Sequence, residues 1–196
     1  DAIAAHGDDR PFVFVDAGAN AGLYTLSVLA DAKALERPLK AVAVEPDIEN
    51  RRRLEFNLAA SGAQDVTVLP YALGAEEGQA ELIQSATNRG EVHIGQAEGE
   101  TGETIRLRPL RAALEEAGTD RVDIMKMDIE GFEEVVLGAF FAGAPQTLWP
   151  AMILLETRHE AAITEGAAGL CLKHGYEVAR QTRQNAVLVL PTGEKS

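Results

Sequence analysis

Two acidic residues each follow a short apolar run, and a glycine-rich turn comes directly after the first. Asp16 follows Val13-Phe14-Val15 and precedes Gly18-Ala19-Asn20-Ala21-Gly22, while Glu45 follows Val42-Ala43-Val44. This order predicts a strand, a turn that opens a helix, and a parallel strand that ends in an acid. Such a unit holds a nucleotide-like cofactor over the strand ends, with the second acid on the ribose hydroxyls.

The glycine spacing discriminates between cofactors. Gly18 and Gly22 are spaced G-x-x-x-G, whereas a dinucleotide fingerprint is G-x-G-x-x-G. Asn20 stands at the middle glycine position, where its side chain would crowd a diphosphate, and Asp16 would repel one. S-adenosylmethionine carries an ammonium and no phosphate, so its ammonium can meet Asp16, directly or through water, and its ribose can meet Glu45. The alternative for Asp16 is a helix N-cap, which does not exclude cofactor contact.

The same reasoning assigns further contacts with the methyl donor. Gly18 lets the backbone pass close to the methionyl part, and Ala19 and Asn20 belong to the same turn. Pro46, next to the ribose-binding acid, is expected to contact the ribose. Ala72 is expected beside the adenine, because a small side chain leaves space for a flat ring.

A second acidic pair, Asp128 and Glu130, is the candidate catalytic group. Methyl transfer is an in-line displacement, so the acceptor must lie behind the methyl group, and a hydroxyl acceptor must lose its proton. If the strand continues to Glu130, alternation places both carboxylates on one side, together with Lys126. We expect Asp128 to orient the donor or acceptor and Glu130 to be the base. The alternative is that Glu130 and Glu133 only open a helix, whose dipole stabilises acids there.

A metal site would draw on residues from two strand ends. Glu156 and His159 follow the next apolar run and, with Asp128, form a set that could hold a divalent cation to polarise the acceptor. Their spacing is too loose for a metal signature. The sequence therefore predicts no metal.

Apolar runs of strand length recur along the chain, at 12–15, 41–44, 66–69, 122–127 and 151–155. Helical stripes between them comprise Leu23, Leu26, Ser27 and Ala30, then Leu54 and Leu58, then Phe132, Val135, Val136, Ala139 and Phe140. Strands that alternate with helices predict an α/β fold, with a mostly parallel sheet covered on both faces. The runs 176–181 and 186–190 have no room for a helix between them and predict an antiparallel hairpin at the sheet edge.

Size and composition predict one domain over residues 1–196. The chain has 196 residues, of which 46% are apolar, enough for a full core. The stretch 74–102 is rich in Gly and Glu and is expected to be an insertion or a flap over the site. Because the chain begins with Asp1 rather than Met, we expect its N-terminus to be trimmed or the chain to belong to a longer protein.

Charge and cysteine content limit partners and compartment. The net charge of −13 disfavours nucleic-acid partners, which are bound through basic faces. No apolar run reaches the ~20 residues of a membrane span, and no signal peptide is visible. The single cysteine, Cys171, excludes an internal disulfide and is expected in a helix as a small apolar residue. A cytoplasmic location fits these features.

Four blocks occur in order between residues 12 and 156. They are FVDAGANAG at 14–22, VEP at 44–46 with Asn57 downstream, YALG at 71–74, and DIMKMDIEGFE at 123–133. Together they resemble the FkbM-type methyltransferases, and the block around Asp128-Ile129-Glu130-Gly131 is the most specific of them. The resemblance implies a class I methyltransferase fold and S-adenosylmethionine as donor. It also implies, as the usual acceptor, a hydroxyl group of a sugar or secondary metabolite.

Two further interpretations remain open at this point. A nicotinamide-dependent oxidoreductase is disfavoured, because the middle glycine is absent and no Tyr-x-x-x-Lys set appears. A methyltransferase-like domain that binds without turnover is the other. N-methylation is also open, because a carboxylate pair can hold an amine. We expect a small-molecule or glycan acceptor, with no nucleic-acid or membrane partner, and the sequence leaves the oligomeric state undetermined.

Overall fold

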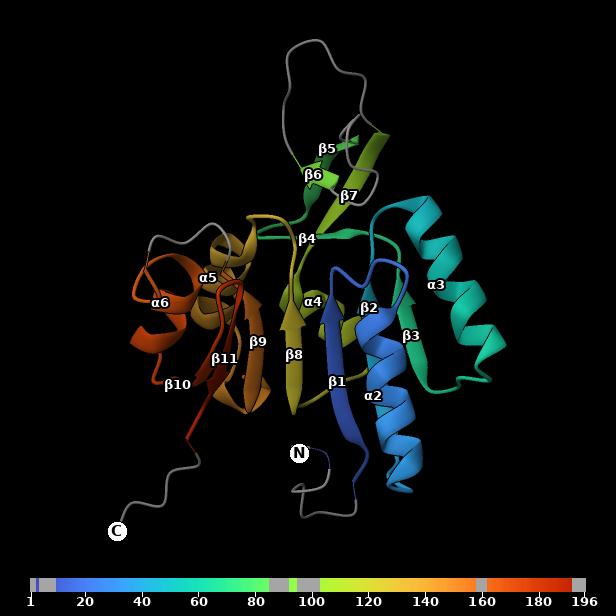
Figure 1. Ribbon diagram of the computed structural model, residues 1–196. Coiled ribbons are helices and arrows are strands. Elements are labelled where there is room, and N and C mark those ends of the chain that lie inside the picture. The colour runs from blue at the N-terminus through green and yellow to red at the C-terminus, as the bar shows by residue number, and fades with distance from the viewer. Residues whose placement is uncertain (1–2, 4–9, 85–91, 95–102, 158–161, 192–196) are drawn as a thin grey trace.

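The computed structural model describes residue 3 and residues 10–84, 92–94, 103–157 and 162–191. Its main sheet has seven strands in the order β10-β11-β9-β8-β1-β2-β3 (Figure 1). The strands of this sheet are β1 (Phe12–Ala17), β2 (Leu39–Val44), β3 (Val66–Leu69), β8 (Ile124–Met127), β9 (Met152–Glu156), β10 (Glu177–Gln181) and β11 (Asn185–Val189). The helices are α2 (Leu23–Ala34), α3 (Ile48–Ala60), α4 (Leu110–Glu116), α5 (Glu133–Gly143) and α6 (Gly166–Lys173), with a 3₁₀ turn at Gln146–Leu148.

The direction of the strands confirms the predicted α/β fold. Strands β3, β2, β1, β8 and β9 run parallel, whereas β11 is antiparallel to both β9 and β10. The last two strands are therefore the expected antiparallel hairpin at the sheet edge. From β1 the chain proceeds outward to β2 and β3, then crosses back to β8 on the other side of β1. Ligands of open α/β sheets bind at such a reversal, outside the carboxyl ends of the strands.

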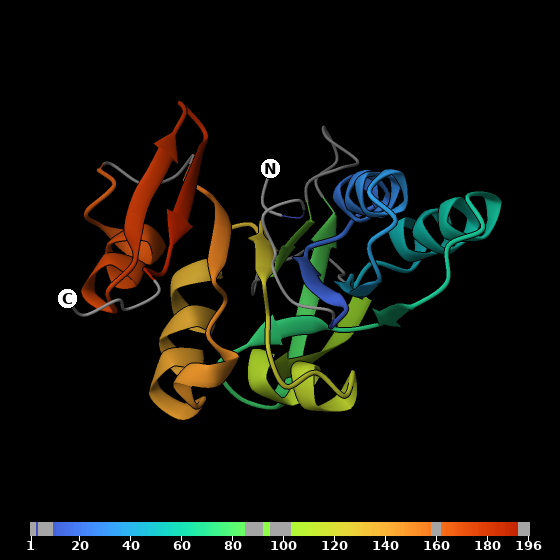
Figure 2. The ribbon, with the colours of Figure 1, turned by 90° about the horizontal axis from the view of Figure 1, so that it is seen from below.

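Helices cover both faces of the main sheet. Helices α2 and α3 lie on one face, and α4 and α5 lie on the other (Figure 2). Side chains of β1 alternate between these faces, as a strand requires. Phe12 and Phe14 belong to the core on the α2 side with Ala32, while Val15 and Ala17 belong to the larger core shared with α4, α5 and α6.

The predicted apolar stripe of the first helix is wrong at three of its four positions; the fourth, Leu26, is half-buried and packs against the core cluster that includes Leu54. Leu23 is 78% exposed, and Ser27 and Ala30 are exposed as well, whereas Thr25 and Ala32 are the buried residues of α2. Relative to the prediction, the helix is turned about its own axis, because the buried side of its first turn carries Thr25, which donates hydrogen bonds to Asp16 of β1. Apolar periodicity alone does not indicate such a polar contact.

The other two helical stripes fit the structure better. Leu54 and Leu58 are both buried on α3. On α5, Val136 and Phe140 are buried as expected, but Val135 is exposed. Cys171 is fully buried within α6, as its apolar character predicts.

The stretch 74–102 contributes to a second, smaller sheet. Its order is β4-β7-β5-β6, and the strands are β4 (Ala72–Gly74), β5 (Gly78–Gln84), β6 (Val92–Ile94) and β7 (Glu103–Pro109). This sheet stands above the carboxyl ends of the main strands (Figure 1), and Leu82 of β5 packs with Ala72 and Ile105. The described part of this stretch forms strands, and residues 85–91 and 95–102 lie outside the described residues.

Two negative findings apply to the part of the chain that the structure describes. None of its helices combines the length and apolar character needed to cross a bilayer. It also holds no group of three or more His, Cys, Asp or Glu side chains arranged to bind a metal ion.

Candidate active site

A pocket of about 340 Å³ opens at the carboxyl ends of β1, β2 and β8, at the point where the strand order reverses. It is lined by the turn after β1 and the start of α2, the end of β2 and the start of α3, the end of β8 and the loop after it, and the strands β4 and β5 of the second sheet. Its walls are Gly18, Ala19, Asn20, Ala21, Leu23, Tyr24, Val44, Glu45, Pro46, Asn50, Ala72, Leu73, Leu82, Lys126, Asp128, Ile129 and Glu130. The structure therefore brings together every predicted site residue except Asp16.

The glycine-rich turn is held against both neighbouring strands. The amides of Gly18 and Ala19 donate to the carbonyl of Val44, at 3.0 and 2.9 Å. Gly18 has φ +78°, and a Cβ built on it would lie 1.9 Å from the carbonyl oxygen of Asp128. Only glycine allows the end of β8 to approach the turn this closely.

Glu45 is buried and braced by backbone amides on both carboxylate oxygens. Oε2 accepts from the amide of Asn20 at 2.7 Å, and Oε1 accepts from the amide of Asp47 at 3.0 Å. Burial raises the pKa of Glu45, although these two hydrogen bonds oppose the shift. Each carboxylate oxygen can accept more than one hydrogen bond. Glu45 can therefore hold hydroxyl groups of a ligand without releasing the turn.

Asp47 has a separate task at the start of α3. Its side chain accepts a hydrogen bond from the amide of Asn50 at 2.7 Å and so caps the helix. This contact fixes the backbone of Asn50, which lines the pocket. Arg51-Arg52-Arg53 follow in the same helix, and Arg52 pairs with Glu49 on its exposed face. No basic residue of α3 lines the pocket among the described residues.

Asp16 is buried and does not line the pocket. Its Oδ2 accepts from both the amide and the hydroxyl of Thr25, at 3.1 and 2.7 Å. Thr25 lies in the first turn of α2, whose N-cap is Gly22 and has no side chain to offer, so Asp16 satisfies that helix end from a distance. Burial raises the pKa of Asp16, while Lys126 and Thr25 oppose the shift. The N-cap alternative is therefore wrong, because the N-cap residue is Gly22, although one oxygen of Asp16 accepts hydrogen bonds from the first turn of the helix.

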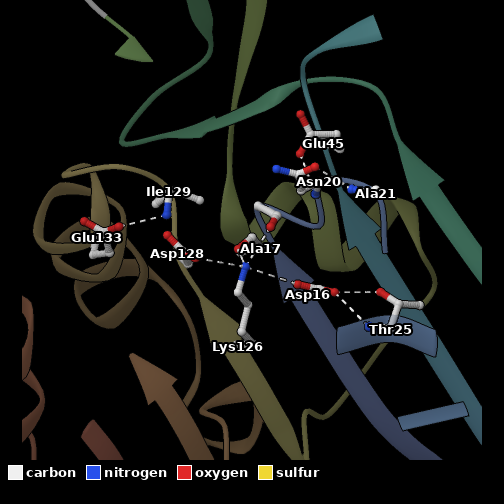
Figure 3. A network of polar contacts seen from close by, with 11 residues as sticks. Asp16, Ala17, Asn20, Ala21, Thr25, Glu45, Lys126, Asp128, Ile129 and Glu133 are labelled. Carbon is white, nitrogen blue, oxygen red and sulfur yellow. Dashed lines mark hydrogen bonds and ion pairs between the residues drawn. The ribbon is translucent and has the colours of Figure 1, made fainter. Parts of the chain in front are cut away.

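Lys126 connects Asp16 to the pocket. Asp16 and Lys126 are register partners on β1 and β8, so their side chains project side by side from the sheet. The Lys126 ammonium lies 3.6 Å from Asp16 Oδ1 and 3.6 Å from Asp128 Oδ2 (Figure 3). It also donates to the carbonyl of Gly18 at 2.7 Å. One buried cation thus joins both acids to the glycine turn.

Asp128 and Glu130 both line the pocket, but the expected reason is wrong. Strand β8 ends at Met127, so side-chain alternation does not extend to Glu130. Glu130 and Gly131 instead adopt positive φ angles of 54° and 95°, which turn the chain towards α5. Glu133 fastens this turn by accepting from the amide of Ile129 at 2.8 Å. The turn, not the strand, brings the second carboxylate to the pocket.

Several residues of the pocket wall were not predicted from the sequence. Leu23 and Tyr24 line the rim, although the first was expected in the core, and the Tyr24 ring lies 5.4 Å from the Lys126 ammonium. Their position directly after the glycine turn is the signal that could have placed them. Leu73 and Leu82 come from the second sheet; residues 74–102 were expected over the site, but no sequence signal singled out either leucine.

Of the residues considered for a metal, Asp128 lines the pocket. Glu156 lies at the end of β9 and is not among the described residues of the pocket wall. His159 lies outside the described residues.

Comparisons with known proteins agree with this geometry. The model of the methyltransferase FkbM domain matches residues 16–177. An FkbM methyltransferase from Methylobacillus flagellatus KT superposes with a TM-score of 0.64 at 18% identity, covering 93% of this chain and 44% of that one. Precorrin-6y C5,15-methyltransferase from Geobacter metallireducens GS-15 superposes with a TM-score of 0.52 at 15% identity, covering 91% and 78%. At such identities the superpositions show a shared fold.

A curated relative matches at the sequence level. AMB antimetabolite synthetase AmbE from Pseudomonas aeruginosa is 28% identical over 221 aligned positions, which cover 90% of this chain and 10% of that protein. The chain thus spans about a tenth of the length of this relative. The match to the FkbM domain model covers most of the chain and sets aside the oxidoreductase alternative. The chain belongs to the FkbM family of S-adenosylmethionine-dependent methyltransferases and has the class I methyltransferase fold.

Proposed function

We propose that the chain methylates a hydroxyl group of a small molecule, a sugar or a secondary metabolite, in the pocket at the ends of β1, β2 and β8. One observation carries this proposal: Asp128 and Glu130 line the same pocket as Glu45 and the glycine turn. A donor held by Glu45 and an acceptor held by Asp128 and Glu130 then share one cavity. Holding both in one cavity supplies the proximity on which methyl transfer depends.

The donor half of the pocket is supported by the shape and polarity of its wall. The Glu45 carboxylate accepts hydrogen bonds from the ribose hydroxyls, and Pro46 lies beside the ribose. The backbone of Gly18, Ala19 and Asn20 forms the surface for the methionyl part. Ala72, with Leu73 and Leu82, offers an apolar slot for the adenine. S-adenosylmethionine supplies the methyl group when bound, and these residues fix where that group points.

The acceptor half must hold the hydroxyl behind the methyl group and accept its proton. The carbon–sulfur bond breaks as the carbon–oxygen bond forms, and the hydroxyl proton passes to a carboxylate. Glu130 is the proposed base, and Asp128 orients the hydroxyl while sharing Lys126. Both carboxylates are placed by the turn after β8, so acceptor binding and proton transfer depend on the same few residues.

The charge of the wall favours a neutral or cationic acceptor. Among the described residues of the pocket, three acids, Glu45, Asp128 and Glu130, face one cation, Lys126. A phosphate would be repelled there, which supports a metabolite or sugar hydroxyl over a nucleic acid. The net charge of −13 supports the same choice.

The test combines donor binding with an acceptor screen. We expect S-adenosylmethionine and S-adenosylhomocysteine to bind in calorimetry, NADH not to bind, and Glu45→Gln to weaken both adenosyl ligands. Transfer of labelled methyl groups is then measured on panels of sugar and metabolite hydroxyls, amines and RNA. Labelling confined to hydroxyls supports the proposal, whereas labelling of amines or RNA overturns the acceptor class. Donor binding without transfer to any panel favours a domain that binds without turnover.

A further inference from the structure

Lys126 carries the only positive charge on the described wall of the pocket. Its side chain is buried, with 5% of the residue exposed, and its neighbours on the wall include three carboxylates. The methionyl end of S-adenosylmethionine bears a carboxylate as well as an ammonium. A carboxylate that enters an acidic pocket is repelled by each surrounding acid and is stabilised by a neighbouring cation. Lys126 is the one cation on the described wall that can supply this stabilisation.

The ammonium of Lys126 also has hydrogen-bonding capacity to spare. It has three N–H donors, and its one contact at ordinary hydrogen-bond length is the carbonyl of Gly18 at 2.7 Å. Its distances to Ala17 O, Asp16 Oδ1 and Asp128 Oδ2 are 3.5, 3.6 and 3.6 Å (Figure 3), beyond the usual range of about 2.7–3.2 Å. A ligand oxygen can therefore occupy a donor without displacing a short contact.

Asp16 lies beside Lys126 outside the pocket wall and holds its ammonium in place. Its Oδ1 is buried and accepts no hydrogen bond, while Oδ2 is occupied by Thr25. Since Asp16 is not on the pocket wall, its charge reaches a ligand through Lys126. Asp16 thereby keeps the ammonium in place and oriented for a second anionic partner.

We infer that Lys126 binds the α-carboxylate of the methyl donor, and that Asp16 is a positioning residue that acts through it. This inference rests on the proposed function, because it requires the donor to occupy this pocket. It assigns the polarity of the methionyl group: the carboxylate lies at Lys126, on the β8 side of the glycine turn. It also replaces the expected contact between Asp16 and the donor ammonium with an indirect role.

The experiment compares two ligands that differ only in that carboxylate. S-adenosylmethionine and decarboxylated S-adenosylmethionine are titrated by calorimetry into the wild type and into Lys126→Met. We expect the substitution to weaken S-adenosylmethionine by about tenfold to hundredfold, the cost of a charge-assisted hydrogen bond. The decarboxylated ligand should bind the variant as well as the wild type or more tightly, because its ammonium no longer meets the lysine charge.

Two further variants separate binding from folding. Lys126→Met leaves Asp16 buried without its counter-ion. The double variant Lys126→Met with Asp16→Asn removes both charges, and its relative affinity for the two ligands should equal that of Lys126→Met alone. Glu45→Gln is the matched control, and it should weaken both ligands equally because both contain the ribose. Thermal unfolding of each variant establishes that it is folded before titration.

The outcomes distinguish this inference from the proposed function. Equal weakening of both ligands by Lys126→Met in a folded protein means that Lys126 only maintains the turn, and overturns the inference. The inference is also overturned if the wild type binds decarboxylated S-adenosylmethionine as tightly as S-adenosylmethionine. If neither ligand binds the wild type, or Glu45→Gln affects neither, the donor does not occupy this pocket and the proposed function fails first.

Discussion

Asp16 and Lys126 are register partners on the adjacent parallel strands β1 and β8, and both side chains are buried. Their charged atoms lie 3.6 Å apart, at the edge of the sheet where the strand order reverses. The pair ties the helix after β1, through Thr25, to the acid after β8, through Asp128. The positions of α2, on the donor side of the pocket, and of Asp128, on the acceptor side, therefore both depend on the ion pair between Asp16 and Lys126.

The pair has a consequence for the pH dependence of stability. Burial raises the pKa of Asp16 above its ordinary value of 3.8, so the folded state holds this proton more tightly than the unfolded state. Its contribution to the free energy of unfolding is then greatest at acid pH and falls as pH rises above 3.8. Asp16→Asn removes this titration. We expect the wild-type free energy of unfolding, measured in urea, to decline relative to the variant from about pH 4 upward. A wild-type free energy of unfolding that rises with pH relative to the variant would contradict this sign.

Gly18→Ala should damage both stability and donor binding. The new Cβ would lie 1.9 Å from the carbonyl oxygen of Asp128, on a residue with φ +78°. Gly62→Ala is the matched control, because Gly62 has φ +64° and no atom within 4 Å of its Cβ position. The control should cost about 1–3 kcal/mol from backbone strain, and Gly18→Ala roughly 3 kcal/mol or more. Denaturation and calorimetry measure both effects, and equal costs would refute the close approach.

Ala72→Leu should close the adenine slot. Ala72 is buried and lines the pocket beneath Leu82 of the second sheet. A larger side chain should lower donor affinity at least about tenfold and cost about 1–3 kcal/mol of stability through overpacking. Ala113→Leu, at a fully buried position of α4 away from the pocket, should cost similar stability without changing affinity. Unchanged donor affinity in Ala72→Leu would place the adenine elsewhere.

The two carboxylates after β8 should differ in their effect on turnover. Glu130→Gln removes the proposed base and should lower kcat/KM for the hydroxyl acceptor by about 10²–10⁴-fold, with donor affinity largely retained. Asp128→Asn should reduce turnover too, and should raise KM for the acceptor more than Glu130→Gln does. Glu134→Gln, an exposed acid in the first turn of α5, is the control and should be neutral. Full activity in both site variants would exclude proton transfer to either carboxylate.

Much of the main sheet and the donor side of the site follows from the sequence. The five parallel strands, the edge hairpin and the turn after β1 were all predicted, because apolar periodicity and glycine spacing are local properties of the chain. Glu45, Pro46 and the turn residues line the pocket as expected, since the ends of adjacent parallel strands necessarily meet. Their contact with the donor stays a prediction that the variants above can test.

The tertiary structure alone decided three features. The second sheet pairs β4 with β7 across more than thirty residues; the sequence suggested that residues 74–102 cover the site, but no local pattern singles out Leu82 as the residue on the pocket wall. Glu130 reaches the pocket through a left-handed turn rather than through strand alternation. Lys126 becomes the central cation because register, which depends on how two distant strands pair, sets it beside Asp16. The sequence determines which residues can do chemistry. The charges of Asp16 and Lys126 lie on two different strands, so they offset each other only once the sheet has formed.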